Sequence, residues 1–198
     1  MKPHLFYVHG TNGSGKSTLA RQLATAAGGV FCGKHAVTGV PVSQALFAPT
    51  GFALIGKYEN ACGGVDGINP YRSAVDTAGI LAKDGISVFM EGLATPGQAT
   101  CKELTDMFNG NATFYLLDVP EADCIANVLK RRARSKRAHT NKPYDPSHLY
   151  KKARSARSWA EALQRNGLRC KVMKPHNVLA DILSQLGIQP PSIETLTS

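Results

Sequence analysis

The sequence predicts an α/β fold in which a parallel β-sheet is covered by helices on both faces. Short apolar segments alternate with segments of helical periodicity along almost the whole chain. The strand candidate at 86–90 is apolar at four of its five positions, which is typical of a strand covered on both faces. A glycine-rich turn follows the first strand and precedes the first helix. In a parallel sheet, such a turn lies at the carboxyl edge, where ligands bind.

Each element has its own local signal. Glycine pairs, proline and Asn-Gly steps end the apolar runs, and apolar residues spaced by three and four mark the helices. Strands are expected at 4–9, 30–32, 52–58, 86–90, 112–119 and 168–173, with 52–58 at an edge of the sheet. Helices are expected from the glycine motif to 27 and at 70–83, 95–109, 118–132, 145–165 and 177–186. A loop is expected over 34–50 and a turn over 63–67.

Length and composition favour one domain over residues 1–198, with a loose tail at 188–198. Hydrophobic residues make up 43% of the chain, and no apolar run approaches a membrane span of roughly 18 residues. The first strand begins too early for a signal peptide, and the five cysteines form no C-x-x-C pair. These features predict a cytoplasmic protein with reduced thiols and no membrane partner.

The positive charge is concentrated in one segment. Residues 130–157 hold eleven Lys and Arg and one acid, Asp145, whereas the rest of the chain is about neutral. The net charge of the whole chain is +9. Such a concentration favours a polyanionic partner, meaning phosphate groups or nucleic acid.

The glycine-rich turn at residues 10–17 has the sequence GTNGSGKS and matches the phosphate-loop pattern G-x-x-x-x-G-K-[ST] at every required position. Its backbone N–H groups and the helix N-terminus are expected to hold the phosphates of ATP. Lys16 is expected to reach the β- and γ-phosphates and to be solvated when no nucleotide is bound. The Ser17 hydroxyl is expected to bind Mg²⁺. The expected nucleotide-binding residues are Asn12, Gly13, Ser14, Gly15, Lys16, Ser17 and Thr18.

Two acids are candidates for the chemistry. Glu91 follows a buried strand, where it would lie near the same Mg²⁺ as Ser17; a surface carboxylate is the alternative. Asp66 lies in the glycine-rich turn at 63–67 and is a candidate base for the attacking hydroxyl. An ordinary turn or capping aspartate is the alternative for Asp66, and the residues alone leave both interpretations open.

The basic segment also has more than one interpretation. Arg131 and Arg132 could clamp the transferring phosphoryl group as part of a lid over roughly 131–146. The later cations could follow a nucleic-acid backbone; these are Lys151, Lys152, Arg154 and Arg157. A solvated helix face is the third possibility, although such faces normally carry interspersed acids.

These residues together resemble the P-loop kinases of the nucleoside and nucleotide kinase group. The resemblance covers roughly residues 4–187 and rests on the phosphate loop, Glu91, the sequence Asp118-Val119-Pro120 and the arginines from Arg131 onward. It implies a three-layer sandwich with a five-stranded parallel sheet, the use of Mg·ATP and an arginine-bearing lid.

Within this group, Ile55-Gly56-Lys57-Tyr58 followed by Gly63-Gly64-Val65-Asp66 is similar to bacteriophage kinases that phosphorylate 5-hydroxymethyluracil in DNA. This narrower resemblance implies DNA carrying that base as the partner, Asp66 as the group that activates the hydroxymethyl oxygen, and the host cytoplasm as the location. Two alternatives stay open, namely a kinase for a free nucleoside, nucleotide or metabolite, and a slow nucleotide-dependent switch protein.

Overall fold

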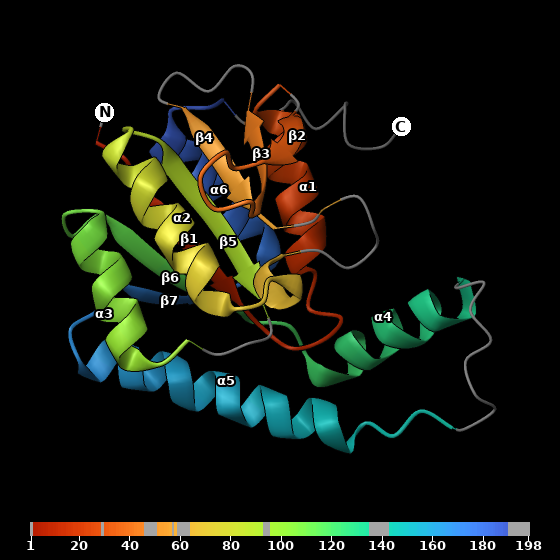
Figure 1. Ribbon diagram of the computed structural model, residues 1–198. Helices are drawn as coiled ribbons and strands as arrows, with labels where there is room; N and C mark the ends of the chain where they lie inside the picture. The colour runs from red at the N-terminus through yellow and green to blue at the C-terminus, as the bar shows by residue number, and fades with distance from the viewer. Residues whose placement is uncertain are drawn as a thin grey trace.

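The computed structural model describes residues 2–28, 30–45, 51–56, 58, 64–92, 96–134 and 143–189. Its centre is a seven-stranded sheet with the order β2-β3-β4-β5-β1-β6-β7 (Figure 1). The strands are β1 Leu5–His9, β2 Val30–Lys34, β3 Pro41–Ala45, β4 Phe52–Ile55, β5 Ser87–Gly92, β6 Ala112–Leu117 and β7 Cys170–Met173. The helices are α1 Lys16–Ala26, α2 Tyr71–Lys83, α3 Gln98–Met107, α4 Glu121–Arg134, α5 Ser147–Arg165 and α6 Pro175–Leu186, with a 3-10 turn η1 at Val65–Gly67.

The three-layer arrangement predicted from the alternation of strands and helices is confirmed. One face of the sheet packs against α2, α3 and α5, and the other packs against α1 and α6 (Figure 1). Every residue of β1, β5 and β6 is buried. These central strands therefore have the near-continuous apolar sequences that a parallel sheet covered on both faces requires.

The prediction of a purely parallel five-stranded sheet is wrong in strand number. Five strands, β4, β5, β1, β6 and β7, are parallel to their neighbours, but β2 and β3 extend the sheet in antiparallel fashion. The loop expected over 34–50 contains β3. Its first residue is a proline and its sequence is PVSQA, so it lacks the apolar run that marked the other strands. Pairing with β2 and β4 stabilises it instead.

The edge position predicted for 52–58 is also wrong, because β4 lies between β3 and β5 and all four of its residues are buried. The register explains where the functional segments meet. His9 at the end of β1 is paired with Gly92 on one side and Leu116 on the other. The carboxyl ends of β5, β1 and β6 therefore lie at one edge of the sheet, as predicted.

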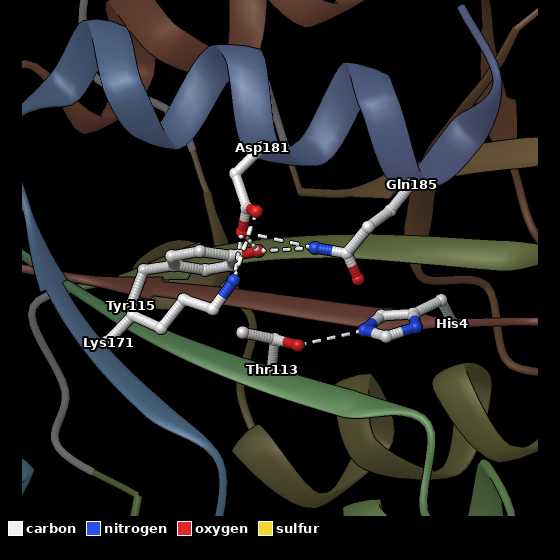
Figure 2. Close-up of polar contacts among 6 residues, drawn as sticks. All are labelled: His4, Thr113, Tyr115, Lys171, Asp181 and Gln185. Atoms are coloured by element: carbon white, nitrogen blue, oxygen red, sulfur yellow. Dashed lines mark hydrogen bonds and ion pairs between the residues drawn. The ribbon is translucent and has the colours of Figure 1, made fainter.

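A polar network fixes α6 to the sheet at the β6–β7 edge (Figure 2). The Tyr115 hydroxyl donates to Asp181 Oδ2 at 2.7 Å, and Lys171 Nζ lies 2.7 Å from the same oxygen. Gln185 Nε2 donates to both Tyr115 and Asp181 at 3.1 Å. Burial alone would raise the pKa of Asp181, but the hydrogen bonds from Lys171 and Tyr115 outweigh it and leave the pKa lowered.

Two predictions concern segments that lie largely outside the described residues. The lid predicted at 131–146 includes 135–142, and the tail predicted at 188–198 includes 190–198. In Figure 1, α4 extends away from the sheet beyond its carboxyl edge and leads into the segment between α4 and α5. No helix in the described part of the chain is long and apolar enough to cross a membrane.

Candidate active site

The glycine motif forms a tight loop between β1 and α1. Gly13 and Gly15 have φ angles of +81° and +93°, a region that favours glycine. A side chain at Gly13 is also excluded by space, because a Cβ there would lie 2.2 Å from the carbonyl oxygen of Cys124 on α4. The Ser14 hydroxyl closes the loop by donating to the Thr11 carbonyl oxygen at 2.9 Å. The residues predicted to bind nucleotide thus form one continuous loop and the first turn of α1, where helix N–H groups face an anion.

Lys16 is held inside this loop, so the prediction that it is solvated is wrong. Lys16 is only 8% exposed, and its Nζ donates to the carbonyl oxygens of Gly10 at 2.8 Å and Thr11 at 2.9 Å. Burial lowers the pKa of Lys16, whereas the nearby carboxylates of Glu91 and Asp66 oppose that shift. If a nucleotide binds, Lys16 Nζ would exchange these two carbonyl contacts for contacts with charged phosphate oxygens.

Ser17 and Glu91 are brought together as predicted. The Ser17 hydroxyl donates to Glu91 Oε1 at 2.8 Å, and Glu91 is 1% exposed. Burial raises the pKa of Glu91 to about 7, and the neighbouring Lys16 and Ser17 only partly oppose this. A hydroxyl and a carboxylate at the N-terminus of the phosphate-loop helix are oxygen donors of the kind Mg²⁺ prefers. The residues therefore fit a Mg²⁺ ion, which would neutralise charge on the nucleotide phosphates.

Asp66 is placed at the same edge by close contacts between glycines. A Cβ at Gly64 would lie 2.2 Å from the backbone oxygen of Glu91 and 2.7 Å from its Cδ. A Cβ at Gly56 would lie 2.5 Å from the backbone of Gly64, and one at Gly92 would lie 2.9 Å from Asp66 Oδ1. The end of β4, the turn and the end of β5 therefore pack backbone against backbone. This packing leaves Asp66 exposed beside Gly92, in electrostatic range of Lys16.

His9 at the end of β1 packs between Gly92 and Trp159 of α5. His9 Nδ1 lies 3.0 Å from the Gly92 carbonyl oxygen, and its ring meets the Trp159 ring edge-on at 4.9 Å. Trp159 anchors α5, because its Nε1 donates to the buried Pro96 carbonyl oxygen at 3.1 Å. Burial lowers the pKa of His9 to about 4, so the imidazole is neutral at physiological pH.

The two arginines predicted to clamp the phosphoryl group occupy different faces of α4. Asn127 Nδ2 donates to the Gly13 carbonyl oxygen at 3.0 Å, and Arg131 lies one turn further along the same helix face. Arg132 instead places its guanidinium 5.2 Å above the ring of Tyr144. Arg131 is exposed one turn beyond the Asn127 contact, whereas Arg132 lies against Tyr144 in the segment before α5. A catalytic role for either arginine stays a prediction.

The cations of α5 also differ in their surroundings. Arg157 forms an ion pair with Glu121 at the start of α4, so it joins the two helices. Lys152 is exposed, and its positive charge makes a small contribution to the lowered pKa values of Lys16 and His9.

Sequence reasoning missed the contact from Asn127, because it depends on how α4 packs against the phosphate loop.

Comparisons with known proteins give one distant relative and several similar folds. No known family profile matches the chain. The chain is 29% identical over 137 residues to the 5-hmdU DNA kinase of Pseudomonas phage PaMx11, a match that covers 66% of this chain and 70% of that protein. A gluconokinase from Sinorhizobium meliloti 1021 has a similar fold, with a TM-score of 0.50 and 14% sequence identity over 94% of this chain and 93% of its own.

This chain resembles P-loop kinases in its phosphate loop, its fold and its distant phage relative. A sugar kinase from Janibacter sp. HTCC2649 also aligns with this chain, with a TM-score of 0.46 and 18% identity over 95% of this chain and 96% of its own. The homology to the phage kinase is distant, and the solved structures show the fold.

Proposed function

We propose that this kinase transfers the γ-phosphoryl group of Mg·ATP to the hydroxymethyl oxygen of 5-hydroxymethyluracil in DNA. The observation that carries the proposal is the position of Asp66. Its carboxylate is held beside Gly92 by glycine contacts and lies in electrostatic range of Lys16, on the phosphate loop. A carboxylate opposite the phosphates is where an acceptor hydroxyl must be oriented.

In the proposed reaction, Asp66 accepts the proton of the hydroxymethyl group as its oxygen attacks the γ-phosphorus. The bond from that phosphorus to the β,γ-bridging oxygen breaks, and ADP leaves with the electron pair. Lys16 and Arg131 stabilise the charge on the phosphoryl oxygens. Mg²⁺ at Ser17 and Glu91 supplies further charge neutralisation when it is bound.

The acceptor side has room for a base-sized group. A recess of about 230 Å³ opens next to the turn that carries Asp66. The tip of the β2–β3 hairpin and the segment leading into α2 form its walls; the lining residues are Lys34, Thr38, Gly39, Val40, Pro41, Gly67, Ile68, Asn69 and Ser73. The distant phage relative and the basic helices α4 and α5 support a DNA acceptor over a free metabolite.

Transfer of labelled phosphate from ATP tests the proposal directly. The acceptors are duplex DNA containing 5-hydroxymethyluracil, matched thymine DNA, the free hydroxymethyl nucleoside, gluconate and water. We expect label in the modified DNA alone. Label only in a free nucleoside or in gluconate would show a small-molecule kinase, and release of phosphate to water alone would show a switch-like hydrolase.

The role of Asp66 is tested by Asp66→Asn, which should lower turnover by roughly 10²- to 10⁴-fold, the range for a positioned acid–base group. The affinity for ATP should be unchanged, because Asp66 is not part of the phosphate loop. A collapse of ATP affinity would instead assign Asp66 to the metal site or to the fold.

The DNA-binding role of α5 is tested by neutralising Lys151, Lys152 and Arg154 together. DNA binding should weaken, and its log–log dependence on salt should flatten by about 0.9 per lost phosphate contact. Arg157 is left in place, because its ion pair with Glu121 joins α4 to α5. An unchanged affinity and salt slope would rule out this helix as the DNA-binding face.

A further inference from the structure

The Tyr58 side chain has an unusual environment and no role in the proposed reaction. Its hydroxyl is buried and has no hydrogen-bond partner, and it is the only such side-chain atom in the described part of the chain. Burial is the main reason that the pKa of Tyr58 is raised well above its ordinary value. Leaving a buried hydroxyl unpaired is unfavourable, so native proteins rarely retain one.

The position of Tyr58 indicates which group could pair with it. Tyr58 follows Gly56, whose backbone touches Gly64, and Gly64 in turn lies against the Glu91 carboxyl group. The Tyr58 ring packs on the α1 side of the sheet, the side to which Glu91 also points when it accepts from Ser17. The negative charges of Glu91 and then Asp66 add to the raised pKa of Tyr58, which agrees with this placement.

Glu91 has unused capacity to accept a hydrogen bond. A carboxylate offers about four acceptor positions on two oxygens. Among the described residues, the Ser17 hydroxyl is the only hydrogen-bond donor to Glu91, and it bonds to Oε1. Hydrogen-bond donors stabilise a buried carboxylate as an anion, and donors that support a metal ligand also fix its orientation.

We propose that Tyr58 is a positioning residue for the metal site: when the magnesium–nucleotide complex binds, its hydroxyl donates a hydrogen bond to the second oxygen of Glu91. This inference rests on the proposed placement of Mg²⁺ at Ser17 and Glu91. In this role, Tyr58 would contribute to metal affinity and not to the affinity for the metal-free nucleotide.

The test is isothermal titration of Tyr58→Phe with ADP, once in the presence of saturating Mg²⁺ and once in EDTA. The expected result is a loss of about tenfold in affinity for Mg·ADP, the lower end of the range for groups that support a metal ligand. The affinity for ADP in EDTA should match that of the wild-type protein. The melting temperature of the variant without nucleotide should be equal or higher, because the change removes an unpaired buried hydroxyl.

Tyr115→Phe is the matched control. It removes a buried tyrosine hydroxyl that does have partners, Asp181 and Gln185, at the α6 side of the sheet (Figure 2). It should lower the melting temperature and leave the affinities for ADP and Mg·ADP unchanged. Together, the two variants separate a metal-positioning hydroxyl from a structural one.

Three results would overturn the inference. Equal Mg·ADP affinity in Tyr58→Phe and wild type would show that Tyr58 does not support the metal site. An equal loss with and without Mg²⁺ would assign Tyr58 to the nucleotide site or to the fold. If Mg²⁺ fails to strengthen ADP binding even in the wild type, the proposed metal placement itself is wrong, and the inference fails with it.

Discussion

The glycine contact that positions Asp66 leads to a prediction about Gly64. An alanine at this position would be strained twice. Its φ and ψ angles are +88° and −163°, a region populated essentially by glycine that costs another residue about 1–3 kcal/mol, and its Cβ would lie 2.2 Å from the carbonyl oxygen of Glu91. A normal contact is about 1 Å longer, so the turn must move by that amount. Overpacking of this kind costs about 1–3 kcal/mol, which makes the total loss for Gly64→Ala about 3 kcal/mol.

Two other glycines separate the contributions. Gly85 also has a positive φ angle, +74°, but open space where a Cβ would lie, so Gly85→Ala measures the strain of a positive φ without a steric contact, about 1 kcal/mol. Gly67 lies in the same turn as Gly64, has no positive φ and also has open space, so Gly67→Ala should be neutral or slightly stabilising. For a chain of this length, the melting temperature should fall by about 6–12 °C in Gly64→Ala and by about 2–4 °C in Gly85→Ala.

The same movement should displace Asp66, because the turn that carries it contacts Gly92. A shift of about 1 Å at a reacting group can lower turnover by about 10²-fold. Phosphate transfer by Gly64→Ala, measured below its melting temperature, should therefore fall while Gly67→Ala and Gly85→Ala retain activity. Equal thermal losses in Gly64→Ala and Gly85→Ala would refute the close contact, and full activity in Gly64→Ala would refute its role in placing Asp66.

Three further predictions follow from buried charges. Lys16→Ala should abolish transfer and also lower the free energy of unfolding by about 1–3 kcal/mol in urea titrations, because Nζ bonds to two loop carbonyls; unchanged stability would contradict that geometry. The Mg²⁺-dependent gain in ADP affinity should increase as pH rises through about 7, where Glu91 loses its proton, and Glu91→Gln should remove this pH dependence in calorimetry. The pKa of Asp181 is lower in the folded than in the unfolded state, so the stability it contributes is present above the unfolded-state pKa and is lost as pH falls through the folded-state pKa. Asp181→Asn should therefore flatten the decline in urea midpoint below about pH 4. An unaltered decline would exclude Asp181 as its source.

Local signals in the sequence were sufficient for the central strands, the helices and the phosphate loop. The runs at β1, β5 and β6 are apolar because both faces of those strands are covered, so composition alone marks them. Strand order at the carboxyl edge then predicted the contact between Ser17 and Glu91, which the structure shows at 2.8 Å. Their role as metal ligands stays a prediction.

The features that sequence reasoning missed depend on partners distant in the chain. β3 is a strand because β2 and β4 pair with it, and β4 is interior for the same reason. The burial of Lys16 depends on how the loop carbonyls fold back over its side chain. None of these relations leaves a periodic pattern in the local sequence.

The two halves of the proposed site are therefore specified differently. The nucleotide half is contiguous, since the loop at 10–17 and the first turn of α1 carry nearly all of its groups, and it can be recognised from eight residues. The acceptor half is assembled from the ends of β4 and β5 and from the turn at η1, held by contacts at Gly56, Gly64 and Gly92. If the proposed reaction is correct, changes in the recess next to η1 should alter the acceptor without disturbing the phosphate loop. The choice between a DNA base and a small molecule must therefore be sought on the β2–β3 and η1 side of the molecule, where the loop motif carries no information.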